Sequence, residues 1–186
     1  MLSEQVWCLN DGHMTIDKKT NTFTYPSELR NLYLQESEIG NNTLRIISNL
    51  ACKGYFPHLE CLDIGTNAVN KDGIDYLLEP LRCNPKQLIN LKILNISLNK
   101  IFHDGILLMA SNQNFGVFDS LIELDLSDIG CNTDSIALFC KAIVVRYEKG
   151  CLSKLLRLRV FGHHPFAGKN ARVMFPEDFL TKVKVS

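Results

Sequence analysis

The stretch that decides the fold is LRNLYL at residues 29–34, in which leucines occupy the first, fourth and sixth places. The same arrangement, with Ile or Val also accepted at the sixth place, returns as LECLDI at 59–64, LKILNI at 91–96, LIELDL at 121–126 and LLRLRV at 155–160. The starts of these segments are 30, 32, 30 and 34 residues apart. A pattern that recurs at such a period indicates stacked copies of one supersecondary unit.

Each unit is predicted to contain a strand, a turn, a helix and a loop. The second and third aliphatic residues are two positions apart, so they share one side of a strand. Apolar residues then recur at helical spacing, as at Leu44, Ile47 and Leu50. Three polar residues are expected to cap helix starts, and two glycines stand where helices should end: Asn42, Asn70 and Thr133, then Gly54 and Gly150. Stacked units can bury an apolar face that one unit alone would expose.

An asparagine follows two of the segments, at Asn67 and Asn99, so that the motif becomes LxxLxLxxN. This motif resembles the leucine-rich repeat, and the long helical second half of each unit resembles the ribonuclease-inhibitor-like subtype. The resemblance covers about residues 29–161. It implies an α/β fold: a right-handed leucine-rich-repeat solenoid, or horseshoe, with parallel strands on the concave face and helices on the convex face.

Two features depart from the family's pattern. The spacing exceeds the roughly 20–29 residues typical of the class, so the connecting loops must be longer. In addition, Ser37 and Ile129 stand where the asparagine is expected. Because the Ile129 side chain cannot form hydrogen bonds, the turn of the fourth unit is predicted to be irregular.

The chain divides into three parts. Residues 1–28 are expected to form an N-terminal cap, with a hairpin between strands at 13–17 and 21–25. Residues 29–161 hold about five repeats. Residues 162–186 lose the pattern and are interpreted as a C-terminal cap or tail, in which a short helix begins after Pro176. Such ends are needed because terminal repeats would otherwise expose their core.

The composition is that of one globular domain. The chain has 186 residues, of which 46% are hydrophobic and 22% are charged. The first residues carry no basic and apolar leader, and no apolar run approaches the roughly 20 residues that span a bilayer. The seven cysteines form no CxxC pair, so we expect reduced thiols, no disulfide framework and a cytoplasmic, intracellular location.

No catalytic motif is found. The sequence lacks GxSxG, a P-loop, HExxH and GxGxxG. The adjacent pair His163 and His164 is more simply explained as part of an exposed loop than as a metal site. We therefore expect no catalytic residue, no cofactor and no metal.

The zero net charge conceals a polarity. Residues 1–135 hold 10 Lys and Arg against 17 Asp and Glu, a net charge of −7, whereas residues 136–186 hold 10 against 3, a net charge of +7. This polarity could steer a charged partner, or the basic segment could simply neutralise its own fold. The basic C-terminal segment is an alternative site for an acidic protein or RNA, but no nucleic-acid-binding module pattern occurs, so nucleic acid is not the expected partner.

Stacked strands place equivalent outward residues in columns. From these columns the predicted partner-binding residues are Tyr33, Gln35, Asp63, Asn95, Ser97, Glu123, Asp125, Arg157, Arg159 and Phe161. Glu123 should pair with Arg157, and Asp125 with Arg159, on neighbouring strands. For the Asp and Asn residues of the central column a purely local backbone role is the alternative, because such residues commonly bond to nearby main chain.

The resemblance implies a non-catalytic protein-protein interaction module that binds a partner protein on the concave strand face. A regulatory leucine-rich-repeat protein, similar to GTPase-activating or ubiquitin-ligase adaptor proteins, is the alternative, and it rests on fold analogy alone. The identity of the partner and the oligomeric state stay open, and no membrane association is expected.

Overall fold

The computed structural model describes residues 15–17, 22–24, 29–83, 88, 90–111, 115–160 and 174–186. Near the N-terminus, strands β1 (Thr15–Asp17) and β2 (Thr22–Thr24) pair antiparallel, with Ile16 opposite Phe23. The two strands predicted for a hairpin are therefore present. Their role as a cap stays a prediction.

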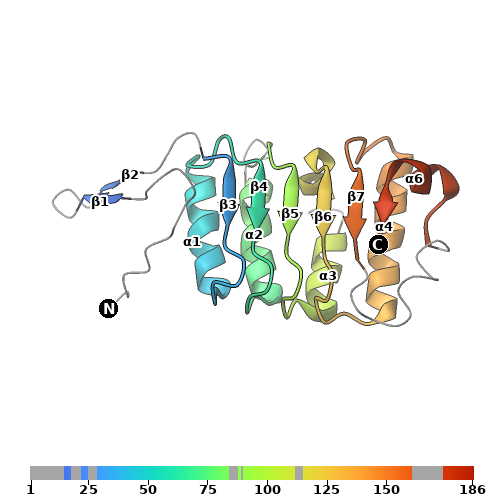
Figure 1. The fold of residues 1–186 in the computed structure, drawn as a ribbon, viewed down its shortest axis with the longest axis horizontal. Helices are drawn as coiled ribbons and strands as arrows, with labels where there is room; N and C mark the ends of the chain where they lie inside the picture. The colour runs from blue at the N-terminus through green and yellow to red at the C-terminus, as the bar shows by residue number, and fades with distance from the viewer. Residues whose placement is uncertain are drawn as a thin grey trace.

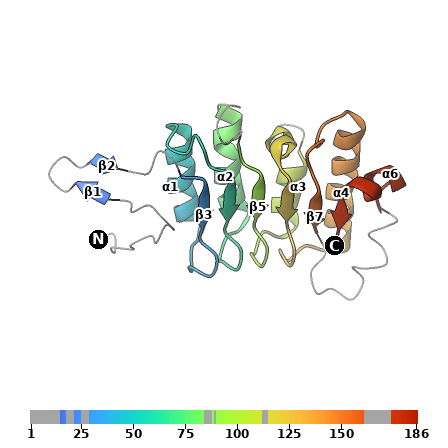
Figure 2. The ribbon, with the colours of Figure 1, turned by 45° about the horizontal axis from the view of Figure 1, so that its top comes forward.

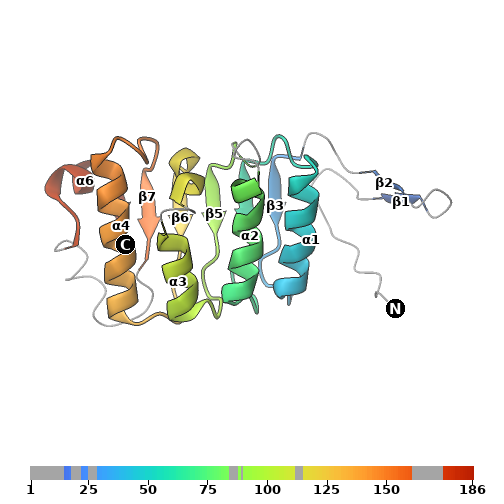
Figure 3. The same cartoon turned by 180° about the vertical axis from the view of Figure 1, so that it is seen from behind.

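The main body is a sheet of six strands that follow one another in chain order, and every neighbouring pair is parallel (Figure 1). The strands are β3 (Asn31–Tyr33), β4 (Cys61–Asp63), β5 (Ile93–Asn95), β6 (Glu123–Asp125), β7 (Arg157–Arg159) and β8 (Lys184–Val185). The helical segments are α1 (Asn41–Cys52), α2 (Lys71–Cys83), α3 (Phe102–Ala110), η1 (Phe115–Ser120), α4 (Thr133–Glu148) and α6 (Glu177–Lys182). Helices α1 to α4 cover one face of the sheet, as the view from behind shows (Figure 3). The predicted α/β class with parallel strands is confirmed.

The register of the sheet agrees with the alignment of the five sequence segments. The second leucine of each segment stands beside its equivalent on the next strand, which gives one column of Leu32, Leu62, Leu94, Leu124 and Leu158. All five are at most 5% exposed. The core lies between the sheet and the helices because each strand turns two aliphatic side chains to that side.

Several predicted helix ends are confirmed and two are corrected. Gly54 and Gly150 follow α1 and α4 with φ of 79° and 78°, a conformation that glycine adopts without steric cost. Asn70 precedes α2 and its Oδ1 accepts the Asp72 N–H at 2.9 Å. Thr133 is not the cap of α4, because Asn132, one residue earlier, reaches the Ser135 N–H at 2.9 Å.

The first helix also begins before its predicted cap. Asn42 lies inside the first turn of α1, and Gly40 stands at the cap position without a side-chain bond. The Gly40 carbonyl accepts the N–H groups of Thr43 and Leu44, at 3.1 and 3.4 Å. The backbone itself therefore closes the first turn there.

The interpretation of residues 162–186 as a cap or tail alone is incomplete, because this segment supplies the sixth parallel strand. The Lys184 N–H donates to the Leu156 carbonyl at 2.8 Å, and the Ser186 N–H donates to the Leu158 carbonyl at 3.1 Å. The alternation in Val183-Lys184-Val185 is typical of a strand, but two apolar residues are too few to stand out in a sequence.

The helix predicted after Pro176 is present as α6. Its Phe179 is fully buried and stacks on Phe175, with ring centroids 4.8 Å apart. The rings of Tyr147 in α4 and Phe179 are nearly perpendicular, with their centroids 5.0 Å apart. This aromatic contact packs α6 against the last long helix.

Asparagines bind the turns of neighbouring units together. Nδ2 of Asn67 donates to the carbonyls of Leu34, Ile64 and Gly65 at 2.8 to 2.9 Å, and its Oδ1 accepts the Ile39 N–H at 3.1 Å. One side chain thus satisfies backbone groups that the turns would otherwise leave without partners.

The turn at Ile129 differs, as its sequence predicted. In two turns that come earlier in the chain, the residue later in the sequence donates its N–H to the carbonyl of the residue earlier in the sequence. The Lys100 N–H, for example, donates to the Val69 carbonyl. At Ile129 the direction reverses: the earlier residue Phe102, with φ of 55°, donates its N–H to the Ile129 carbonyl at 2.9 Å.

Among the described helices, none has both the length and the apolar character needed to cross a membrane.

Candidate functional site

The candidate site is the face of the six-stranded sheet that points away from α1 to α4, called here the open face (Figure 2). Strand alternation turns the residues between the buried leucines to this side. Its described residues are Asn31, Tyr33, Gln35, Cys61, Asp63, Gly65, Ile93, Asn95, Ser97, Glu123, Asp125, Ser127, Arg157, Arg159 and Lys184.

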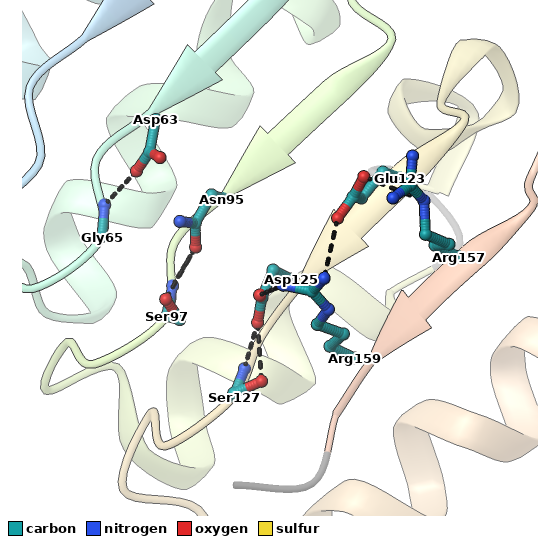
Figure 4. Close-up of polar contacts among 9 residues, drawn as sticks. All are labelled: Asp63, Gly65, Asn95, Ser97, Glu123, Asp125, Ser127, Arg157 and Arg159. Carbon is teal, nitrogen blue, oxygen red and sulfur yellow. Dashed lines mark hydrogen bonds and ion pairs between the residues drawn. The ribbon is translucent and has the colours of Figure 1, made fainter. Parts of the chain in front are cut away.

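The central column of the open face has a local backbone role. One side-chain oxygen of Asp63 accepts the Gly65 N–H at 2.9 Å. In the same way, Asn95 accepts the N–H of Ser97 at 3.0 Å, and Asp125 accepts that of Ser127 at 3.0 Å (Figure 4). These side chains shape the turn that leaves each strand. The local bonds expected for the three residues are therefore present, and Asp125 in addition pairs with Arg159.

Gly65, in the first of these turns, is closely surrounded by neighbouring side chains. A Cβ built on Gly65 would lie 3.0 Å from Nδ2 of Asn95 and 3.2 Å from Oδ1 of Asp63. A side chain at position 65 would therefore press on the side chains of both residues.

The two predicted cross-strand ion pairs are present. Nε of Arg157 lies 3.1 Å from Oε2 of Glu123, and Nη1 of Arg159 lies 3.0 Å from Oδ2 of Asp125. A third, diagonal contact places Nη2 of Arg159 3.6 Å from Oε1 of Glu123. The two carboxylates of β6 are thus held by the two guanidinium groups of β7 (Figure 4).

The partners in this cluster differ sharply in exposure. The side chains of Glu123 and Asp125 are 14% and 10% exposed, whereas those of Arg157 and Arg159 are 52% and 46% exposed. The carboxylates lie beneath the guanidinium groups. Although the charges balance in number, the surface that a partner would meet is cationic.

The other end of the open face carries one exposed aromatic and one exposed apolar side chain among polar residues. The side chains of Tyr33 on β3 and Ile93 on β5 are exposed, and Cys61 lies between their strands, nearly buried. The neighbouring Cys61 thiol raises the pKa of the Tyr33 phenol above its ordinary value of 10.0. Burial raises the pKa of Cys61 above 9.0. Both groups are therefore neutral at pH 7.

A charged row at the strand starts was missed by sequence reasoning. Glu60 accepts from Arg30 Nη1 at 2.6 Å and from Lys92 Nζ at 2.7 Å. The hydrogen bond from Lys92 is the largest cause of the lowered pKa of Glu60, and the bond from Arg30 lowers it further. The signal was available: the three residues occupy the second place of consecutive segments and alternate in sign.

The structure brings nine of the ten predicted binding residues onto one face, and Phe161 lies outside the described residues. Ser97 and Asp125 are buried and offer little surface. Ile93 and Lys184 are exposed on the open face and were not predicted. Lys184 was missed because its strand had been interpreted as tail.

No catalytic arrangement emerges from the described ranges. His103 contacts the Ser135 hydroxyl between α3 and α4, but Ser135 is fully buried, so no substrate can reach it. Within those ranges, no three His, Cys, Asp or Glu side chains gather as metal ligands would. His163 and His164 lie outside them.

A scan against models of known protein families finds no match, and no curated protein matches the sequence.

Proposed function

We propose that this chain is a leucine-rich-repeat protein of the ribonuclease-inhibitor-like kind, and that it is a non-catalytic module that binds a partner protein on the open face. In this proposal the sheet is the concave side of a right-handed solenoid. The LxxLxL segments and the turn asparagines Asn67 and Asn99 support the repeat assignment. The segments contain parallel strands, and both asparagine side chains donate to backbone carbonyls at the ends of those strands.

The observation that carries the binding proposal is the character of the exposed residues on the open face. Tyr33 is 52% exposed, and the two arginines of β7 are about half exposed. Tyrosine and arginine are the residue types that most often dominate binding energy in protein interfaces. They project from strands, which hold side chains more firmly than loops do.

The test is a cross-linking pull-down of partner proteins from cell lysate, made with the full native chain and with two matched variants. In the open-face variant, Tyr33→Ala and Ile93→Ser remove the exposed apolar side chains of β3 and β5. In the control variant, Ile46→Ala and Leu138→Ser remove exposed apolar side chains of α1 and α4, each 51% exposed, compared with 52% for Tyr33 and 36% for Ile93. Asp63 and Asp125 are left intact because they hold the turns.

Circular dichroism first shows that both variants keep the native helix content. We expect the native chain and the control variant to capture the same protein, and the open-face variant to lose it. Capture that is lost only in the control variant would place the binding site on the helices and contradict the proposal.

A further inference from the structure

The cationic end of the open face contains donors that the ion pairs do not use. Arg157 meets Glu123 through Nε at 3.1 Å, and within the described part of the chain no hydrogen bond or ion pair to another residue engages its two Nη groups. Those two groups form the fork with which arginine binds a carboxylate through two parallel hydrogen bonds. Glu123 therefore fixes the orientation of the guanidinium group while its outer edge faces solvent.

A second cation lies directly beside this arginine. The register of β7 and β8 places Lys184 opposite Arg157, and Lys184 is exposed without an ion-pair partner among the described residues. Like charges directly opposite one another on neighbouring strands repel. An anion bound between the two would remove this repulsion, and no carboxylate of the described chain occupies that place.

We propose that Arg157, Arg159 and Lys184 bind the carboxylates of an acidic segment of the partner protein, and that an apolar residue of the same segment packs against Tyr33 and Ile93. This inference rests on the proposed function and names the chemistry of the partner.

The geometry of the sheet sets the spacing within that segment. Neighbouring strands lie about 4.8 Å apart, so Arg157 is about 10 Å and Lys184 about 14 Å from the column position of Ile93. An extended chain advances about 3.3 Å per residue. The acidic residues of the partner should therefore stand three to four positions from its apolar residue.

The charges on the rest of the face favour a peptide over a nucleic acid. Asp63 lies beside Tyr33, and Glu36 and Glu38 are exposed in the turn that follows β3. A continuous polyanion that crossed the sheet would meet these carboxylates, whereas a peptide can place its acidic groups at one end only.

The test is a selection from a phage-displayed library of random 12-residue peptides on the immobilised full chain. We expect selected peptides to be enriched in Asp or Glu three to four positions from an aromatic or aliphatic residue. One selected peptide, labelled with fluorescein, then gives the affinity by fluorescence anisotropy.

Two charge reversals form a matched pair. Lys184→Glu breaks no observed ion pair and should weaken the peptide about tenfold, the effect expected for one charge-assisted bond. Lys141→Glu makes the same change in net charge on exposed α4 and should leave the affinity unchanged. Higher salt should weaken binding to the native chain.

Each other outcome overturns the inference. Selected peptides that lack acidic residues but need Tyr33 and Ile93 would overturn it and leave the proposed function standing. Peptides that bind the Lys184→Glu and the Tyr33→Ala, Ile93→Ser variants unchanged would overturn both. A selection that enriches no such peptides would overturn the inference as well. So would a 20-nucleotide poly-uridine RNA that binds the native chain more tightly than the peptide does and no longer binds the Lys184→Glu variant.

Discussion

Asn99 and Val69 lie in neighbouring turns, 30 residues apart in the chain, and Oδ1 of Asn99 accepts the Val69 N–H at 2.9 Å. The amide nitrogen of Asn99 donates to three further carbonyls, those of Ile64, Ile96 and Ser97. Asn99 is 3% exposed. A single buried amide thus bonds to four backbone groups of successive turns, with its two N–H hydrogens shared among three carbonyls.

We expect Asn99→Leu to lower the free energy of unfolding by about 2–4 kcal/mol, because leucine fills the space but leaves buried backbone groups without partners. Urea unfolding followed by circular dichroism measures the change. Asn42→Leu, at an exposed position in the first turn of α1, is the control and should change little. Equal losses at the two sites would contradict this role for Asn99.

Leu124 lies inside the buried leucine column, between Leu94 and Leu158. Leu124→Ala should destabilise the fold by about 2–5 kcal/mol, because both neighbouring units limit how far the cavity can close. Leu156→Ala, at a position 54% exposed, should cost less than about 0.5 kcal/mol. The urea midpoints of the two variants give the comparison, and a small effect at Leu124 would show that the column does not hold the units together.

Asp125 both pairs with Arg159 and holds the turn at Ser127, whereas Arg159 forms ion pairs alone, with Asp125 and Glu123. Asp125→Ala removes both the ion pair with Arg159 and the bonds to Ser127, so we expect it to cost about 1 kcal/mol more than Arg159→Ala. A double-mutant cycle should give a coupling energy of about 0–1 kcal/mol for the pair, since the guanidinium group is half exposed. A coupling well above this range, or equal single-variant losses, would assign the stability to the pair rather than to the turn.

Burial raises the pKa of the Cys140 thiol to about 12 and that of Cys131 to about 11, from an ordinary value of 9.0. The folded chain therefore keeps both protons where the unfolded chain loses them. The contribution of these thiols to the free energy of unfolding is therefore fully present below about pH 9. It is lost as the pH rises towards the pKa values that the thiols have in the folded chain. Urea midpoints should fall between pH 9 and 11.

Replacing Cys140 by Ala is the control for this pH dependence. The fall in the midpoint should become shallower in that variant, even though its stability at pH 7 is lower. Iodoacetamide at pH 8 should label Cys140 in the urea-unfolded chain and leave it unmodified in the folded chain. Rapid labelling of the folded chain would show that the thiol is not buried.

Several features of the fold followed directly from local sequence. The register of Leu32, Leu62 and the later leucines could be predicted because side chains alternate strictly along a strand and the LxxLxL spacing never varies. Gly54 and Gly150 marked helix ends because few other residues adopt a positive φ readily. The cap of α4 was misplaced by one residue, since Asn132 and Thr133 are both able to cap and only the local path of the chain selects one.

The candidate site was less predictable, because the exposure of each side chain to a partner depends on neighbouring residues that are distant in the sequence. Sequence placed Glu123, Asp125, Arg157 and Arg159 side by side, and their pairing was confirmed. It gave no indication that the carboxylates would be sheltered, nor that Lys184 would join them from a sixth strand.

The sequence by itself determined which side chains of the five LxxLxL segments enter the core and which of those five strands stand beside one another, because those properties depend on a short period repeated along the chain. The tertiary structure alone decided which charges a partner can reach. The exposure of a guanidinium group above a carboxylate depends on how strands 34 residues apart pack, as β6 and β7 do. No local sequence pattern determines how far each charged side chain is exposed.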